Sequence, residues 1–256
     1  MENNIARPVQ NSLDRFEEKF KNLLTSNVPF ADFILQYVSE KQGKRIRPIV
    51  IFLSSKLHGI INHDAIQSAL VIEMFHTATL IHDDVVDESN QRRGERTVND
   101  RWNNKTAVLI GDFLFSKTLA GMVNLENREA LKLLAKASED ITEGELLQIA
   151  YSGKSDLTES EYYNIIRNKT AVLFRIASQL GVLCNGGDQS HFERMGTFGD
   201  HFGMAFQIMD DVLDFIGSSD KMGKPSCKDI REKKLTLPLI HVIDRKSTRL
   251  NSSHYS

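Results

Sequence analysis

The chain has 256 residues, 41% hydrophobic and 26% charged, a composition that argues against a mostly disordered protein. Its 32 basic and 34 acidic residues give a net charge of −2, so no basic excess favours nucleic acid or an acidic membrane surface as a partner. The two cysteines, Cys184 and Cys227, form no CxxC pair, which disfavours a disulfide scaffold or zinc knuckle and fits a reducing cytoplasm.

Neither a secretory signal nor a membrane span is expected. The first twenty residues contain no apolar core of a signal peptide. No apolar run approaches the roughly 18 residues that a spanning helix needs. We therefore expect a cytoplasmic protein without an integral membrane segment.

The distribution of proline predicts the fold class. Residues 49–224 contain no proline, and proline costs about 3 kcal/mol inside a helix. A first helix is indicated by apolar residues three and four apart between Leu13 and Leu24. Further helices are predicted at residues 30–40, 47–57, 63–87, 106–124, 128–151, 159–168, 170–183 and 188–216. The polar stretches 88–100 and 217–229 are predicted to be loops, and the whole is an all-α, antiparallel bundle.

The last residues differ from the rest of the chain. Residues 244–254, DRKSTRLNSSH, have no apolar period and match a translation of a common sequencing adapter. We therefore expect one domain over residues 1–243, with residues 244–256 as an artefactual tail.

Two short acidic motifs carry the clearest chemical signal. DDVVD contains Asp83, Asp84 and Asp87, and its carboxylates share a helix face because they lie three and four residues apart. DDVLD repeats the pattern at Asp210, Asp211 and Asp214. Clustered carboxylates repel one another unless a cation joins them, and oxygen ligands suit Mg²⁺ shared with a phosphate. Either motif alone could be a solvated acidic face, but a coincidental pair is improbable.

Basic residues near these motifs suggest sites for diphosphate groups. Lys44 and Arg47 flank a predicted helix start, and Arg92 and Arg93 follow the first acidic motif. His76 lies two helical turns before Asp83, although a lone histidine in an apolar helix is more often a core residue. Further candidates are Lys169, Thr170, Gln207, Lys224 and Lys234.

Five ordered segments together resemble a trans-isoprenyl diphosphate synthase of the polyprenyl synthetase family. They are GKRIRP at 43–48, IHDDVVDESNQRRG at 81–94, Lys169-Thr170, FQIMDDVLDF at 206–215 and KLTLP at 234–238. The resemblance covers residues from about 10 to 243, without the final helices of the family. It implies a deep central cavity whose mouth carries the two acidic motifs, and a homodimer.

The resemblance also implies roles for individual residues. The six motif aspartates would bind Mg²⁺, three ions per active site, and would act in catalysis together with Lys169. Isopentenyl diphosphate would bind at Lys44, Arg47, His76 and Arg93. The allylic diphosphate would bind at Arg92, Lys169, Thr170, Gln207, Lys224 and Lys234.

The implied reaction is head-to-tail condensation of isopentenyl diphosphate with an allylic diphosphate, giving an all-trans polyprenyl diphosphate. Two alternatives stay open: a short-chain farnesyl or geranylgeranyl diphosphate synthase, and a non-catalytic subunit of a heteromeric prenyl synthase. A terpene cyclase or squalene-synthase-like enzyme is disfavoured because GKRIRP and His76 indicate a second, basic diphosphate site.

Product length is expected to depend on the helix that ends in DDVVD. Short-chain relatives have an aromatic cavity floor four or five residues before the first aspartate, where this chain has Thr79 and Ala78. A helix rises about 5.4 Å per turn, comparable to one isoprene unit. The small residues therefore predict a medium or long product, with Phe75 and Met74, or Phe115 and Leu119, as a deeper floor.

Overall fold

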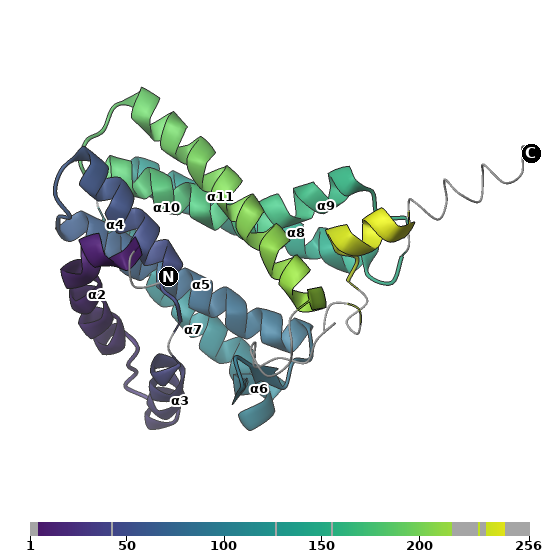
Figure 1. Ribbon diagram of the computed structural model, residues 1–256. Helices are drawn as coiled ribbons and strands as arrows, with labels where there is room; N and C mark the ends of the chain where they lie inside the picture. Colours follow the sequence, from purple (N-terminus) through teal and green to yellow (C-terminus); the bar gives the residue numbers. More distant parts are fainter. Residues whose placement is uncertain are drawn as a thin grey trace, which may run out of the picture. The chain divides into compact units, whose positions relative to one another are not determined.

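The computed structural model describes residues 5–41, 43–125, 127–154, 156–216, 230 and 234–243 (Figure 1). Helices dominate these residues, which confirms the predicted all-α class. The helical elements are η1 (Arg7–Val9), α2 (Gln10–Leu23), α3 (Pro29–Glu40), α4 (Ile46–His58), α5 (His63–Val86), α6 (Val98–Arg101), α7 (Asn104–Val123), α8 (Arg128–Tyr151), α9 (Glu159–Ile166), η2 (Arg167–Ala171), α10 (Val172–Leu183) and α11 (Gln189–Ile216). The predicted loop at 217–229 and the tail at 244–256 lie outside the described residues.

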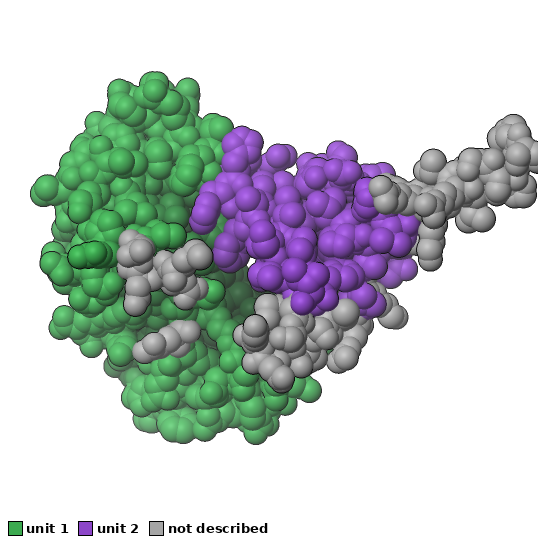
Figure 2. Space-filling view, viewed as in Figure 1, with its two compact units in different colours: residues 1–135, 173–199 green, residues 136–172, 200–256 purple. Residues whose placement is uncertain are grey.

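The chain divides into two compact units, which Figure 2 colours separately. The first unit contains residues 1–135 and 173–199, and the second contains residues 136–172 and 200–256. The acidic motif at 83–87 belongs to the first unit, and the motif at 210–214 belongs to the second.

Helix α5 is the central helix of the first unit and packs against α7, α4 and α2. The side chain of Asn62 caps its start by accepting a hydrogen bond from the Ala65 backbone N–H at 2.9 Å. Residues on nearly every side of α5 are buried, as its uniformly apolar sequence predicts. This burial fixes the axis that carries His76 and the first acidic motif.

Helix α7 approaches α5 closely because two of its residues are glycines. A Cβ on Gly121 would lie 2.9 Å from Val71 Cγ2, and a Cβ on Gly111 would lie 2.2 Å from His82 Nε2. Between them, the rings of Phe75 and Phe115 pack with centroids 5.8 Å apart. The glycines therefore bring α7 against the face of α5 that leads to the first acidic motif.

By length and composition, α7 is the one helix among the described residues that could cross a membrane. The expectation concerned unbroken apolar runs and is not contradicted, because the charged residues Asp112 and Lys117 interrupt α7. A core helix of a soluble protein passes the same test, and α7 packs along α5. Its Lys117 Nζ also donates to the Leu23 carbonyl at 2.9 Å.

The stretch 88–100, predicted as a loop, contains a small hairpin and a helical turn. Strand β1 (Gln91–Arg92) pairs antiparallel with β2 (Glu95–Arg96), and α6 follows. Arg93 and Gly94 both have positive φ, 55° and 80°, as a tight two-residue hairpin turn requires. The prediction failed here because arginine seldom adopts this conformation, so its sequence gives no turn signal.

In the second unit, the predicted break at Lys169 is a change of helix type. Helix α9 begins with a capping box in which Thr158 and Glu161 bond reciprocally. It continues without interruption into the π-helix η2, and then into α10. A π-helical turn is often found at functional sites. The core of this unit comprises Leu157, Tyr162, Ile165, Ile166, Ala171, Met204 and Ile240, the last from a short helix at 237–243.

Candidate active site

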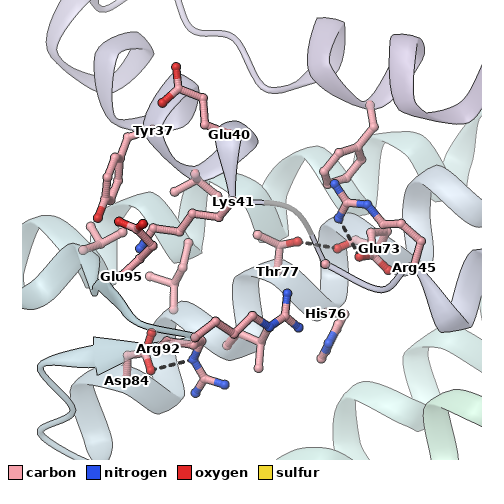
Figure 3. Close-up of a pocket in the computed structure, with 17 residues that line it drawn as sticks. Tyr37, Glu40, Lys41, Arg45, Glu73, His76, Thr77, Asp84, Arg92 and Glu95 are labelled. Atoms are coloured by element: carbon pink, nitrogen blue, oxygen red, sulfur yellow. Dashed lines mark hydrogen bonds and ion pairs between the residues drawn. The ribbon is translucent and has the colours of Figure 1, made fainter. Parts of the chain in front are cut away.

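A cavity of about 370 Å³ lies in the first unit beside the C-terminal half of α5 (Figure 3). It is bounded by the end of α3, the turn before α4, helix α5 and the β1–β2 hairpin. Its charged or titratable lining residues are Tyr37, Glu40, Lys41, Arg45, Glu73, His76, Asp84, Arg92, Arg93 and Glu95. Several guanidinium groups around one small cavity are suited to an anion with multiple oxygens.

His76 lines this cavity together with Arg93, as the family resemblance implies. Burial lowers the pKa of His76 well below its ordinary value, and the positive charges of Arg47, Arg92, Arg93 and Arg45 lower it further. The imidazole is therefore neutral at pH 7 and offers one donor and one acceptor.

Arg47 lies close enough to His76 and Arg93 to act on them electrostatically, although it is not among the lining residues. Its guanidinium lies 4.7 Å from the centroid of the Phe174 ring, and its buried Nε has no hydrogen-bond partner in the described part of the chain. Burial lowers the pKa of Arg47 to about 10, with Glu73 opposing and Arg93 adding to the effect. A buried donor without a partner is the kind of group that an anionic ligand satisfies.

Lys44 lies between Gly43 and Arg45, which both line the cavity. Its side chain is exposed, and it is not among the lining residues. The structure therefore brings His76, Arg92 and Arg93 together at the cavity, with Arg47 close by and Lys44 at the surface.

The first acidic motif forms the C-terminal end of α5, and its members differ in exposure. Asp84 is buried and its Oδ1 accepts a hydrogen bond from Arg92 Nε at 2.8 Å. Asp83 and Asp87 are partly exposed, and Asp87 is the C-cap residue. The predicted allylic-site residue Arg92 thus pairs with the motif itself.

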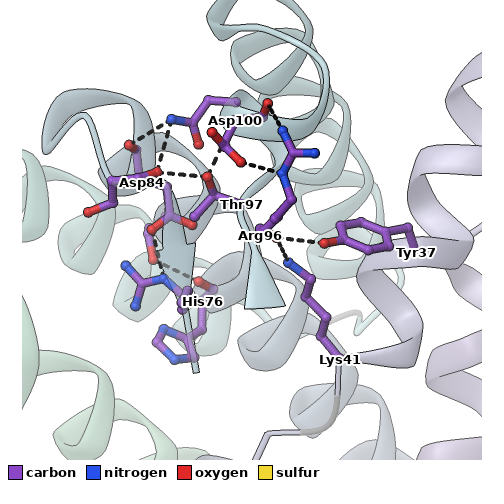
Figure 4. A network of polar contacts seen from close by, with 11 residues as sticks. Tyr37, Lys41, His76, Asp84, Arg96, Thr97 and Asp100 are labelled. Carbon is purple, nitrogen blue, oxygen red and sulfur yellow. Dashed lines mark hydrogen bonds and ion pairs between the residues drawn. The ribbon is translucent and has the colours of Figure 1, made fainter. Parts of the chain in front are cut away.

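The segment after α5 fixes the end of this helix (Figure 4). The Ser89 backbone N–H donates to the Asp84 carbonyl at 2.9 Å, and Asn99 Nδ2 donates to the same carbonyl at 3.2 Å. Thr97 Oγ1 donates to the Ser89 carbonyl at 2.7 Å. The two bonds to Asp84 satisfy a carbonyl group that a helix end otherwise leaves without a partner, and the bond to Ser89 holds the segment that follows.

A second set of contacts in Figure 4 joins the hairpin to α3. Tyr37 Oη donates to the Arg96 carbonyl at 2.6 Å, and Lys41 Nζ donates to the same carbonyl. Lys41 Nζ also lies 4.3 Å from the centroid of the Tyr37 ring. This junction closes one wall of the cavity, and none of its residues was predicted from the sequence.

The second acidic motif lies near the end of α11, and its middle aspartate is held by two donors. Tyr162 Oη donates to Asp211 Oδ2 at 2.5 Å, and Gln207 Nε2 donates to Oδ1 at 2.7 Å. Thr170 Oγ1 in turn donates to Gln207 Oε1 at 2.8 Å. Burial raises the pKa of Asp211, while Tyr162 and Gln207 oppose this shift. The chain thus assembles Thr170 and Gln207, two predicted residues, with Tyr162, which the sequence did not reveal.

The neighbours of Asp211 are less buried: Asp210 is exposed and Asp214 is partly buried. Tyr162 escaped sequence reasoning because its partner Asp211 lies 49 residues further along the chain. No local feature of the sequence marks this tyrosine as a partner of the second motif.

Lys169 lies in the π-helix η2, where its ammonium group is paired. Its Nζ is 2.5 Å from Glu145 Oε1 and 3.4 Å from Gln148 Oε1, both on α8. A Cβ on Gly144 would lie 3.1 Å from the Lys169 backbone nitrogen, so α8 approaches the π-helix closely at this glycine. Lys234 is partly buried, and Lys224 lies outside the described residues.

The carboxylates suit Mg²⁺ by chemistry and by spacing along each helix. Asp83 and Asp87, like Asp210 and Asp214, lie four residues apart on one helix face. Asp84 and Asp211 are instead buried against donors of this chain. Within the described residues, no three His, Cys, Asp or Glu side chains form a ready-made metal cluster. The donor set is nonetheless the all-oxygen type that Mg²⁺ prefers when substrate oxygens and water complete its shell.

The residues proposed to set product length lie on α5 below the motif. Ala78 is 1% exposed, and Met74 and Phe75 are also buried. Phe75 contacts Phe115 of α7, as described above. Thr79 is partly exposed and donates from Oγ1 to the His76 carbonyl at 2.9 Å.

Known proteins are similar in sequence to this chain over most of its length. All-trans-nonaprenyl-diphosphate synthase (geranyl-diphosphate specific) of Rhodobacter capsulatus is 41% identical over 237 residues, covering 92% of this chain and 73% of the relative. Octaprenyl diphosphate synthase of Escherichia coli K12 is 37% identical over 220 residues, covering 86% of this chain and 68% of the relative.

A solved structure shares the fold. The polyprenyl synthase of Caulobacter crescentus CB15, complexed with calcium and isoprenyl diphosphate, superposes with a TM-score of 0.92 at 35% identity. The match covers 98% of this chain and 77% of that one. The family model described as Polyprenyl synthetase matches residues 29–254. The resemblance carried by the five sequence segments is confirmed, and this chain belongs to the polyprenyl synthetase family.

Proposed function

We propose that this chain is a prenyltransferase that condenses isopentenyl diphosphate head to tail with an allylic diphosphate. The product is an all-trans polyprenyl diphosphate of medium or long chain. The observation that carries the proposal is the cavity beside α5, where a neutral His76 and the guanidinium groups of Arg92 and Arg93 lie next to the first acidic motif. The relatives named above support the reaction class.

The proposed roles combine what the family resemblance implies with the surroundings of each residue. Arg47 and Arg93 would bind the diphosphate of isopentenyl diphosphate, with a hydrogen bond from His76 and the exposed Lys44 at the rim. Arg92, Lys169, Thr170 and Gln207 would contact the allylic diphosphate. Lys169 would then exchange its pairing with Glu145 for a diphosphate oxygen, since both are anionic partners.

The reaction proceeds by ionisation, condensation and elimination. The allylic C–O bond breaks, the double bond of isopentenyl diphosphate attacks the carbocation, and a proton leaves to the departing diphosphate. Mg²⁺ bound by Asp83 and Asp87 and by Asp210 and Asp214 would supply positive charge that stabilises the leaving group. Asp84 and Asp211 would hold Arg92 and the Gln207–Thr170 pair in place.

The carbocation must be kept from water, and buried apolar residues of α5 provide such surroundings. The small Ala78 supports a product longer than that of short-chain relatives. We further propose that the protein is a cytoplasmic homodimer, as the family resemblance implies; light scattering after size exclusion would measure its mass.

The direct test supplies the purified protein with isopentenyl diphosphate, farnesyl diphosphate and Mg²⁺, and separates the products by reversed-phase chromatography. We expect all-trans products several isoprene units longer than the primer. Products from farnesyl diphosphate alone would indicate a cyclase or a squalene-synthase-like enzyme. A single added unit would indicate a short-chain synthase, and no product would indicate a non-catalytic subunit.

A further inference from the structure

Arg45 is the middle basic residue of GKRIRP, and its hydrogen-bonding groups face this chain's own carboxylates. Its Nε donates to Glu17 Oε1 at 2.7 Å, and its Nη2 donates to Glu17 Oε2 at 3.3 Å. Its Nη1 donates to Glu73 Oε1 at 2.8 Å, and the guanidinium lies 4.7 Å from the centroid of the Phe20 ring. With its side chain 10% exposed, Arg45 is bound between α2 and α5.

The backbone of Arg45 is in a conformation that needs such support. Its φ of 48° is left-handed, and it is the N-cap residue of α4 without any capping hydrogen bond from its side chain. A residue with a Cβ adopts this region at an energetic cost, and it persists only where the surroundings hold it. Glu17 on α2 and Glu73 on α5 both bind the Arg45 side chain and so provide that restraint.

The strained turn places its neighbours at the cavity. A Cβ on Gly43 would lie 3.0 Å from Arg93 Nη1, so the backbone of the turn lies against the Arg93 guanidinium. Arg47 follows two residues after Arg45, in the first turn of α4. Glu73 is 5% exposed, and its charge acts on Arg47 and Arg93 as well as on Arg45.

We propose that Arg45 is a positioning residue: clamped between Glu17 and Glu73, it holds the left-handed turn that sets Lys44, Arg47 and Arg93 for a diphosphate, without binding the diphosphate itself. This inference rests on the proposed function, because it takes the cavity beside α5 as the isopentenyl diphosphate site. Measuring the binding of isopentenyl diphosphate apart from turnover distinguishes the clamp from the proposed function.

The decisive variant is Glu17→Gln, with Glu18→Gln as its matched control. Both remove one negative charge from α2. Glu18, however, is exposed and is not one of the partners of the Arg45 guanidinium. A clamp predicts that Glu17→Gln weakens binding of isopentenyl diphosphate about five- to tenfold, measured by calorimetry on the full chain without divalent metal. Glu18→Gln should stay within about twofold of wild type.

If Arg45 instead contacted the diphosphate directly, Glu17→Gln would change the affinity in the opposite direction. Glu17→Gln would then release donors of Arg45 and remove a repelling charge, so binding would become tighter. Affinity equal to or above that of wild type therefore overturns the clamp. In turnover, the clamp predicts a raised KM for isopentenyl diphosphate, with kcat and the allylic KM within about twofold.

Two replacements of Arg45 test the backbone part of the argument. Arg45→Met removes the clamp and keeps the cost of the left-handed turn, whereas Arg45→Gly removes the clamp and also relieves that cost. We expect Arg45→Gly to bind isopentenyl diphosphate at least about threefold more tightly than Arg45→Met. Equal affinities would contradict a positioning role.

Wild-type behaviour separates this proposal from the proposed function. A wild-type chain that binds isopentenyl diphosphate but elongates no primer would contradict the function, while the affinities of the variants would still test the clamp. A wild-type chain that does not bind isopentenyl diphosphate would overturn both, because there would be no diphosphate to position.

Discussion

Each acidic motif contains three aspartates, and the middle one is buried. The two that flank it, which lie four residues apart, are more exposed. Asp84 is paired with Arg92, and Asp211 receives hydrogen bonds from Tyr162 and Gln207. Burial of a carboxylate is costly unless its oxygens are satisfied, and both residues meet this condition. We therefore propose that the more exposed flanking aspartates bind the metal and that the middle ones have a supporting role.

Replacing a flanking aspartate should cost more activity than replacing a middle one. Asp83→Ala or Asp210→Ala is expected to lower kcat by at least about 100-fold, since each removes a ligand that stabilises the leaving group through the metal. Asp84→Asn should lower kcat less and raise the KM for the allylic substrate, because Arg92 loses its ionic partner. Asp64→Asn, at the other end of α5, is the control; similar kinetics for Asp83→Ala and Asp64→Asn would refute the assignment.

His76 predicts a defined pH dependence of stability. Its pKa in the folded protein is well below the value of about 6.5 expected in the unfolded chain. As pH falls below about 6.5 the unfolded state takes up the proton first, so the folded state loses stability until the pH reaches the folded pKa. His76→Gln cannot be protonated, so its melting temperature should fall less than that of wild type between about pH 7.5 and 5.5. If the melting temperatures of both proteins change equally with pH, the histidine is not held neutral in the folded state.

At the scale of elements, glycines determine how closely helices approach and hence where the site residues lie. A Cβ on Gly181 of α10 would lie 2.5 Å from the Ile51 carbonyl oxygen and 2.8 Å from the Ser55 backbone nitrogen, both on α4. Backbone atoms cannot move aside as a side-chain tip can. The same pair of helices places Arg47 over Phe174.

Gly181→Ala should therefore destabilise the protein more than Gly121→Ala. Alanine gains about 1 kcal/mol of helix propensity over glycine, while overpacking a core costs about 1–3 kcal/mol and more against a rigid neighbour. We expect a net loss of about 2 kcal/mol for Gly181→Ala. Gly121→Ala meets the Cγ2 methyl group of Val71 instead of backbone atoms and should cost less than Gly181→Ala, about 1 kcal/mol. Urea unfolding of both variants gives the comparison, and equal stabilities would contradict it.

Helix α5 also leads to a prediction about product length. Ala78 lies between the first acidic motif and Phe75, and each helical turn below the motif corresponds to about one isoprene unit. Ala78→Tyr is expected to shorten the product to roughly three or four isoprene units while condensation continues. Reversed-phase chromatography of the products measures this. An active variant with the wild-type product length would show that the growing chain does not pass Ala78.

At the scale of the whole molecule, the two acidic motifs belong to different compact units, and the proposed reaction needs both. Six carboxylates carry a charge of −6, so binding of an allylic diphosphate is unfavourable until cations compensate them. Divalent cations are therefore expected to be required for turnover.

Removing divalent metal tests this requirement. Excess EDTA should abolish product formation, and added Mg²⁺ should restore it. Binding of isopentenyl diphosphate at the arginine-lined cavity should persist in EDTA, since Arg47 and Arg93 supply its charge. Full turnover in EDTA would exclude a metal-assisted mechanism for this chain.

The sequence by itself determined the helical class, most helix bounds and the two acidic motifs at helix ends. These features depend on local periodicity, proline placement and short motifs, all of which are written in consecutive residues. The predicted helix at 128–151 matches α8 residue for residue, and the motif at 83–87 does end α5. The residues that the family resemblance groups together, His76 with Arg93 and Thr170 with Gln207, are also neighbours in space.

Only the tertiary structure decided which charged residues line the cavity and which are bound by side chains of this chain. Arg45 and Arg47 look alike in sequence, but Glu17 and Glu73 occupy the first, while the Nε of the second has no partner in the part of the chain that the structure describes. Tyr162 gave no signal because its partner Asp211 is distant in sequence. The π-helical turn and the Arg93-Gly94 hairpin likewise depend on packing, since neither is the preferred local conformation of its residues.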